Sequence, residues 1–141
     1  LQYIDMLNNS DESMISFQLS YQEKKYSIQE IGNLLEIDST DKVFDTGQLV
    51  GGILIMKKHD KTKYILNKCI ELLTKDKLII TDEYNKKNQL ESFIDNRHDQ
   101  SILSLVRKKY GSIILQDETW FEPFGSKESL KFPFWATRIR K

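Results

Sequence analysis

The segment Arg97-His98-Asp99-Gln100-Ser101 concentrates ionisable and amide side chains where a polar loop meets an apolar-periodic stretch. The period predicts a helix, so these side chains belong to its first turn. That turn leaves backbone N–H groups unpaired and carries partial positive charge, which favours anionic or oxygen-rich ligands. Asp and Ser also begin helices simply as caps. Ligand binding and capping are therefore both open for this segment.

Three kinds of chemistry fit His98, Asp99 and Gln100. A carboxylate beside an amide both accepts and donates hydrogen bonds, which suits vicinal sugar hydroxyls. His98 and Asp99 are also metal-ligand types, although a metal site needs further ligands from elsewhere in the chain. Either residue can act as a general base. The alternative is a capped helix with an exposed His98.

Helices and strands are expected to alternate around this segment. We predict helices at residues 1–8, from Ser27 to before Asp38, at 60–73 and at 98–110, and strands at 14–19, 47–56, 77–81 and 112–115. Ser27 and Glu30 have the spacing of a capping box. A long polar loop is expected at 82–96, and loops of this length are often functional. The alternation favours an α/β fold with a mixed, partly parallel sheet flanked by helices.

The run Gly47–Met56 is nearly continuously apolar, which predicts one strand buried on both faces. Gly51 and Gly52 inside it are costly unless a ligand or another strand approaches the backbone, or unless the strand bulges there. The pair is too short for a phosphate-binding loop. Close approach and a bulge are both open.

The remaining chemistry-bearing residues lie further along the chain. Cys69 falls on the apolar face of a predicted helix and is expected to be a core residue. The aromatic tail from Trp120 to Trp135 can stack on a sugar ring or a base, or can cover an edge of the core. The closing basic residues can contact phosphate or form a solvated terminus; they are Arg138, Arg140 and Lys141.

Composition limits the function classes. The chain has 141 residues, enough for one domain, with 21 Lys plus Arg against 21 Asp plus Glu, and this lack of basic excess argues against a nucleic-acid binder. No apolar run reaches the roughly 20 residues that a membrane-spanning helix needs. A single cysteine forms no intramolecular disulfide, which fits a cytoplasmic location. The chain begins at Leu1 inside a predicted helix, so we expect it to be the C-terminal part of a larger domain.

The order of these features resembles a known family. A glycine-containing strand (Val50-Gly51-Gly52-Ile53) leads to an amphipathic helix, a loop, the helix start Asp99-Gln100-Ser101-Ile102-Leu103 and a short strand. This order resembles the C-terminal half of a GT-A-fold glycosyltransferase, most closely the retaining family-8 type and related bacterial and viral sugar transferases. The stretch Arg97–Leu105, with Pro133-Phe134-Trp135-Ala136, also resembles poorly characterised glycosyltransferase-like proteins. The resemblance covers roughly residues 45 to 136.

The resemblance implies a nucleotide-sugar donor, a glycan or other acceptor, and Mn²⁺ or Mg²⁺ as cofactor. Asp99 would hydrogen-bond sugar hydroxyls and Gln100 would lie beside the reacting anomeric carbon. Gly51 and Gly52 would let the sugar lie against the backbone. Arg97, His98 and Trp135 are further candidates for substrate binding.

The sequence also departs from the family pattern. Ser101 replaces the second Asp of the family's Asp-Gln-Asp, and Asp38-Ser39-Thr40-Asp41 lacks the Asp-x-Asp spacing that holds the metal. His98 is the nearest candidate for a late metal-binding histidine. We therefore expect the metal and nucleotide to be held mostly by sequence before Leu1.

Two other functions stay open. One is a non-catalytic module on the same fold that binds a glycan or a protein partner. The other is a metal-dependent phosphohydrolase of the all-helical His-Asp type, suggested by the doublets His59-Asp60 and His98-Asp99 together with Asp117.

Overall fold

Residues 1–137, which the computed structural model describes, fold around a four-stranded sheet centred on β1 (Met14–Gln22). β4 (Ile113–Gln116) runs parallel to β1, with Ile15 opposite Ile113. β2 (Gly47–Leu49) and β3 (Ile55–Met56) pair antiparallel with the other edge of β1, where Ile15 lies opposite Ile55. The sheet is therefore mixed and partly parallel, and the predicted α/β class is confirmed.

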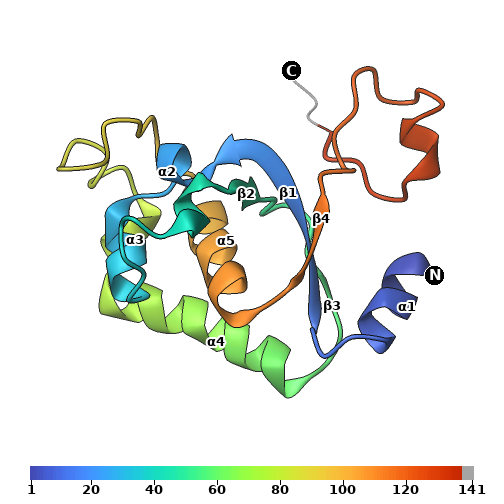
Figure 1. The fold of residues 1–141 in the computed structure, drawn as a ribbon, viewed down its shortest axis with the longest axis horizontal. Coiled ribbons are helices and arrows are strands. Elements are labelled where there is room, and N and C mark those ends of the chain that lie inside the picture. The colour runs from blue at the N-terminus through green and yellow to red at the C-terminus, as the bar shows by residue number, and fades with distance from the viewer. Residues whose placement is uncertain (138–141) are drawn as a thin grey trace.

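Helices cover this sheet unequally. α3 (Gln29–Leu34), α4 (Asp60–Lys75) and α5 (Asp99–Tyr110) group on one side of β1, whereas α1 (Gln2–Asn8) and the C-terminal segment lie on the other side (Figure 1). The short helix α2 (Glu23–Tyr26) directly follows β1. 3₁₀ turns occupy Lys42–Asp45, Lys77–Ile80 and Ser129–Lys131.

The main core lies between β1 and the grouped helices. Met14 of β1 is fully buried, together with Ile65 of α4 and Leu105 of α5. The apolar period at residues 60–73 therefore faces this core as predicted, and Cys69 is buried there with 8% of its surface exposed. Burial of this apolar face, worth about 1.5–3 kcal/mol for each large side chain, holds the helices against the sheet.

A smaller contact joins α1 to the C-terminal segment. The Tyr3 ring lies edge-on to Phe17 of β1, 5.9 Å between ring centres, and 5.8 Å from the ring of Phe134. The Tyr3 hydroxyl donates a hydrogen bond to Glu118. Burial and this acceptor both raise the pKa of Tyr3 above its ordinary range. α1 thus packs on the side of β1 that the grouped helices leave free, and Phe134 of the aromatic tail packs against α1.

Three sequence expectations were wrong in detail. Residues 47–56 form two short strands rather than one, separated by the irregular stretch 50–54. Residues 77–80 form a 3₁₀ turn instead of a strand, because the Asp76 side chain accepts a hydrogen bond from the Leu78 backbone and starts a helical turn. Ser27 does not cap α3, since its hydroxyl donates to the buried Glu23 carboxylate.

The predicted loop and the helix after it are confirmed. Residues 82–96 contain no helix or strand. The end of this loop is anchored by Asn96, whose buried side-chain amide donates hydrogen bonds to the carbonyls of Ile79 and Thr81. α5 then ends before Gly111, which adopts a φ of 109°.

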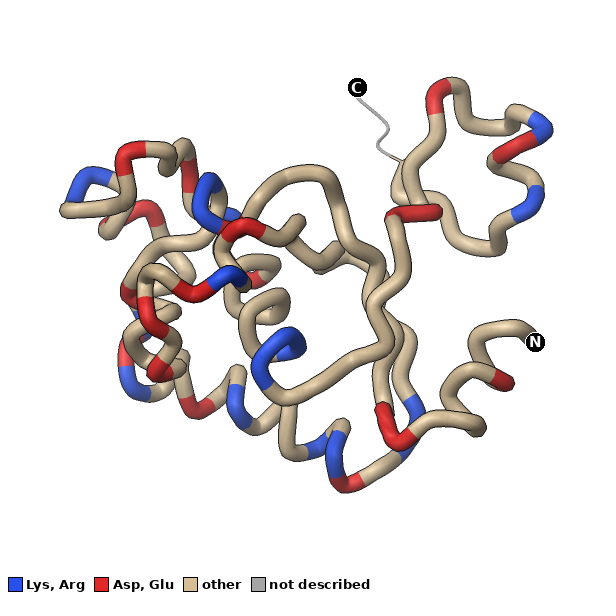
Figure 2. The backbone as a smooth tube through the Cα atoms, in the orientation of Figure 1, with Lys and Arg blue, Asp and Glu red and all other residues tan. Residues whose placement is uncertain are grey.

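Lys/Arg and Asp/Glu positions are interspersed along the backbone rather than gathered on one element (Figure 2). Within residues 1–137, no helix has the length and apolar character needed to cross a bilayer.

Candidate functional site

A cavity of about 880 Å³ lies where β1 ends, beside the break between β2 and β3, the start of α5 and the C-terminal segment. Amides, hydroxyls and aromatic rings dominate its lining. The lining includes Val50, Gly52 and the following polar or aromatic residues: Tyr21, Tyr26, Gln48, Arg97, Gln100, Asp117, Thr119, Trp120 and Trp135. Mixed aromatic and amide linings of this kind are typical of small-molecule sites.

Four of the residues predicted from sequence meet at this cavity. Gly52, Arg97, Gln100 and Trp135 all line it, although they come from three separate parts of the chain. Gly51 adjoins it, because its backbone N–H donates to Gln100 Oε1 at 3.1 Å. The predicted proximity of the glycine pair to Gln100 is therefore present in the structure.

His98 and Asp99 lie outside the lining of this cavity. Asp99 is exposed, and His98 Nε2 pairs with Asp82 Oδ1 of the preceding loop at 2.7 Å. Successive side chains on a helix diverge by about 100°, so the orientation that directs Gln100 toward Gly51 directs Asp99 elsewhere. Asp99 and Gln100 therefore do not face one pocket together.

Gln100 holds the backbone at the strand break. Its Oε1 accepts from Gly51, and its Nε2 donates to Gln48 Oε1 at 2.6 Å. A Cβ atom on Gly51 would lie 2.9 Å from Gln100 Cβ, whereas a Cβ on Gly52 would meet no atom within 4 Å. Gly51 thus lacks room for a side chain because α5 packs closely against its backbone. Gly52 instead leaves open space at the cavity wall.

Gln48 also contacts a buried polar cluster around Glu23. Glu23 is fully buried, and its carboxylate accepts from Lys108 Nζ at 2.8 Å, from Ser27 Oγ at 2.5 Å and from Ser104 Oγ. Gln48 joins this cluster through Nε2, which lies 3.1 Å from Ser27 Oγ. Burial lowers the pKa of Lys108, and the Glu23 carboxylate opposes that shift. Both charges are therefore paired inside the protein, which offsets the cost of removing them from water.

Arg107 is a second buried cation, fixed by neutral acceptors. Its Nη2 donates to the Val50 carbonyl at 2.8 Å, its Nη1 to Ser16 Oγ at 3.0 Å, and its Nε to the Leu103 carbonyl at 2.9 Å. Burial lowers the pKa of Arg107 to about 10. Since Val50 lies where β2 ends, Arg107 fixes the carbonyl at the first residue of the strand break.

Glu23, Arg107 and Lys108 of this buried cluster were not predicted from the sequence. Arg107 and Lys108 fall in a basic run at the end of α5, where cations are common because they complement the helix dipole. Glu23 follows β1 in a polar stretch that predicts only a turn. Gln48 did give a signal, because it is a polar residue inside an otherwise apolar run.

The other ionisable and aromatic groups of the cavity lie at its wall. The Arg97 guanidinium stacks 4.7 Å from the centre of the Tyr26 ring. Asp117 Oδ1 accepts from both the backbone N and the hydroxyl of Thr119, at 2.9 and 2.6 Å. Trp135 Nε1 donates to the Ser129 carbonyl at 2.9 Å, and its side chain is partly exposed.

The resemblance led us to expect a metal ion. Within the part of the chain that the structure describes, no group of three or more His, Cys, Asp or Glu side chains could hold one. His59 accepts a hydrogen bond from the Lys61 backbone at 3.1 Å and so caps α4.

The four-stranded sheet contradicts the all-helical fold that the phosphohydrolase alternative requires. Arg138, Arg140 and Lys141 lie outside the described residues.

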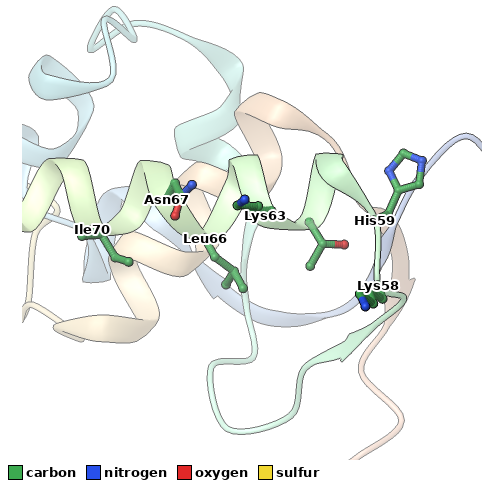
Figure 3. A pocket seen from close by; sticks show the side chains of 7 residues that line it. Lys58, His59, Lys63, Leu66, Asn67 and Ile70 are labelled. Atoms are coloured by element: carbon green, nitrogen blue, oxygen red, sulfur yellow. The ribbon is translucent and has the colours of Figure 1, made fainter.

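A second, smaller hollow of about 370 Å³ follows one side of α4 (Figure 3). Its labelled side chains are Lys58, His59, Lys63, Leu66, Asn67 and Ile70. None of the residues predicted to bind sugar lines it. The larger cavity is therefore the candidate site.

No protein-family model matches this sequence, and no curated protein or solved structure shows significant similarity to it.

Proposed function

We propose that the protein binds a carbohydrate in the 880 Å³ cavity, as the sugar-holding part of a nucleotide-sugar-dependent glycosyltransferase. The observation that carries this proposal is the convergence of Gly52, Gln100 and Trp135 on one cavity. The resemblance to GT-A-fold transferases independently implies that these residues bind the substrate.

The lining has the chemistry that a sugar ring needs. Sugar hydroxyls both donate and accept hydrogen bonds, and so do the carboxamides of Gln18 and Gln116, which line this cavity. Trp120 and Trp135 are half-exposed at its wall and offer flat apolar faces beside polar groups. Gly52 presents backbone without a side chain, which lets a ligand approach closely.

A divalent cation is expected from the resemblance, but the cavity residues do not fit one. Mn²⁺ and Mg²⁺ prefer several oxygen ligands. Among residues 1–137, Asp117 is the one carboxylate that lines the cavity, and its Oδ1 already accepts two hydrogen bonds from Thr119. No step that we assign to this chain therefore involves a metal ion.

Calorimetric titration tests sugar binding directly. The probes are glucose, galactose, N-acetylglucosamine, UDP-glucose and GDP-mannose. We expect saturable binding of at least one probe and a loss of about ten-fold in affinity in Trp120→Ala, because base and sugar rings stack on exposed indole. Tyr64→Ala is the matched control, since Tyr64 is a half-exposed aromatic residue on α4 that does not line this cavity. Absence of binding, or equal losses in both variants, would refute the proposal.

A non-catalytic glycan-binding module is the second candidate, and a specific observation favours it. Both polar atoms of the Gln100 amide are engaged, by Gly51 and Gln48, and Asp99 faces away. Incubation with the same nucleotide sugars and Mn²⁺ separates the two functions. Release of UDP or GDP supports the transferase, whereas binding of saccharide without release supports the module.

A further inference from the structure

Arg97 is presented at the cavity in a defined orientation. Its backbone N–H is held by the Tyr26 carbonyl at 3.1 Å and by Ser101 Oγ at 3.1 Å. Its guanidinium lies 4.7 Å from the Tyr26 ring centre, and that ring in turn packs edge-on against Tyr21 at 5.6 Å. Stacking on an aromatic face leaves the in-plane N–H donors of a guanidinium directed outward. The side chain is exposed and lines the cavity.

The charge of Arg97 is not neutralised by the cavity wall. No carboxylate within residues 1–137 forms an ion pair with it. Asp117, the other charged residue of the lining, is engaged by the Thr119 hydroxyl and backbone. The start of the twelve-residue helix α5 lies next to Arg97 and adds partial positive charge at the same place.

We propose that Arg97 makes this cavity selective for saccharides that carry an oxyanion, either a carboxylate or a phosphate group. The inference rests on the carbohydrate-binding function proposed above. A guanidinium fork binds both groups in a bidentate manner, and Lys does not reproduce that geometry. The Gln18 and Gln116 amides and the indole faces of Trp120 and Trp135 line the same cavity, where the neutral part of the ring would lie.

Matched pairs of ligands test this selectivity by calorimetry at low ionic strength. Glucuronate and glucose 6-phosphate are compared with glucose, and galacturonate with galactose. We expect at least ten-fold tighter binding of an acidic member than of its neutral counterpart. Tighter binding of the uronates identifies a carboxylate as the preferred group, whereas tighter binding of glucose 6-phosphate identifies a phosphate.

Three variants assign the preference to Arg97. Arg97→Gln is expected to bring the ratio of acidic to neutral affinity to about one, and Tyr26→Leu to lower it by removing the stacking surface. Lys86→Gln is the control, because it removes the same charge from an exposed residue outside the cavity and is expected to leave the ratio unchanged.

The outcomes separate this inference from the function on which it rests. Neutral and acidic sugars that bind equally well would leave carbohydrate binding in place and overturn the selectivity. A ratio that persists in Arg97→Gln, or that falls equally in Lys86→Gln, would also overturn it. If none of these saccharides binds, both proposals are wrong.

Discussion

Replacing Gly51 or Gly52 of the strand break by alanine should affect the free energy of unfolding differently. A Cβ on Gly51 would lie 2.9 Å from Gln100 Cβ and 3.2 Å from both Gln100 Cα and Cγ. Two of these atoms belong to the rigid part of α5, so rotation of the Gln100 side chain does not relieve the overlap. A Cβ on Gly52 meets nothing within 4 Å. The two substitutions therefore add the same methyl group, at Gly51 against closely packed atoms and at Gly52 into open space.

The magnitude follows from two opposing effects. Overpacking a filled site costs about 1–3 kcal/mol. Replacing Gly by Ala where the backbone tolerates it stabilises a protein by about 0.4–1 kcal/mol, because the unfolded chain loses freedom. We therefore expect Gly51→Ala to lower the free energy of unfolding by about 1–2 kcal/mol. Gly52→Ala is expected to leave it unchanged or to raise it by less than about 1 kcal/mol.

Urea unfolding followed by far-ultraviolet circular dichroism measures both values on one scale. Equal stability of the two variants would refute the close packing of α5 against Gly51. The double variant Gly51→Ala/Gln100→Ala tests the mechanism further, because alanine at position 100 keeps the Cβ atom that makes the shortest contact. Recovery of stability in this double variant would show that the long side chain, rather than the helix, opposes the substitution.

Other predictions concern ionisable side chains. Glu23→Gln should lower the free energy of unfolding by about 3 kcal/mol, because Lys108 loses its buried counter-charge, and adding Lys108→Met should restore part of it; an unchanged urea midpoint in Glu23→Gln would contradict this. Cys69 should react with a thiol reagent at pH 8 only as the protein unfolds, since the side chain is buried and burial raises its pKa to about 11; rapid labelling of the folded protein would contradict the burial. Because the folded pKa lies above the ordinary value of 9.0, the stability that the protonated thiol contributes is complete below pH 9 and is lost as the pH rises toward about 11. The difference in free energy of unfolding between the native protein and Cys69→Ala should therefore shrink over that interval. Tyr3→Phe should cost about 1 kcal/mol, because it removes the hydrogen bond to Glu118 but keeps the ring against Phe17; a loss in Tyr3→Phe as large as in Tyr3→Ala would show that the hydroxyl, and not the ring, makes the larger contribution.

Local pattern was sufficient wherever neighbouring residues set the structure. The apolar period of α4 and α5 predicted both helices and their buried faces, because side chains three and four residues apart share one side of a helix. The predicted helix 98–110 ends as expected, because Gly111 after Tyr110 adopts a φ of 109°, a conformation that glycine favours at helix ends. The pattern was insufficient at residues 47–56, since an apolar run does not reveal where pairing with β1 stops.

The sequence by itself thus determined the class of fold, most helices, and the small set of residues near Gln100 and Gly52 that reach the candidate site. Only the tertiary structure decided which of them face the cavity, turning Gln100 and Arg97 toward it and Asp99 away. It also decided that Glu23 and Lys108, far apart in the chain, are buried as a pair. The physical reason is that helical and strand periods depend on neighbouring residues, whereas the loss of water around a charge depends on distant segments that pack over it.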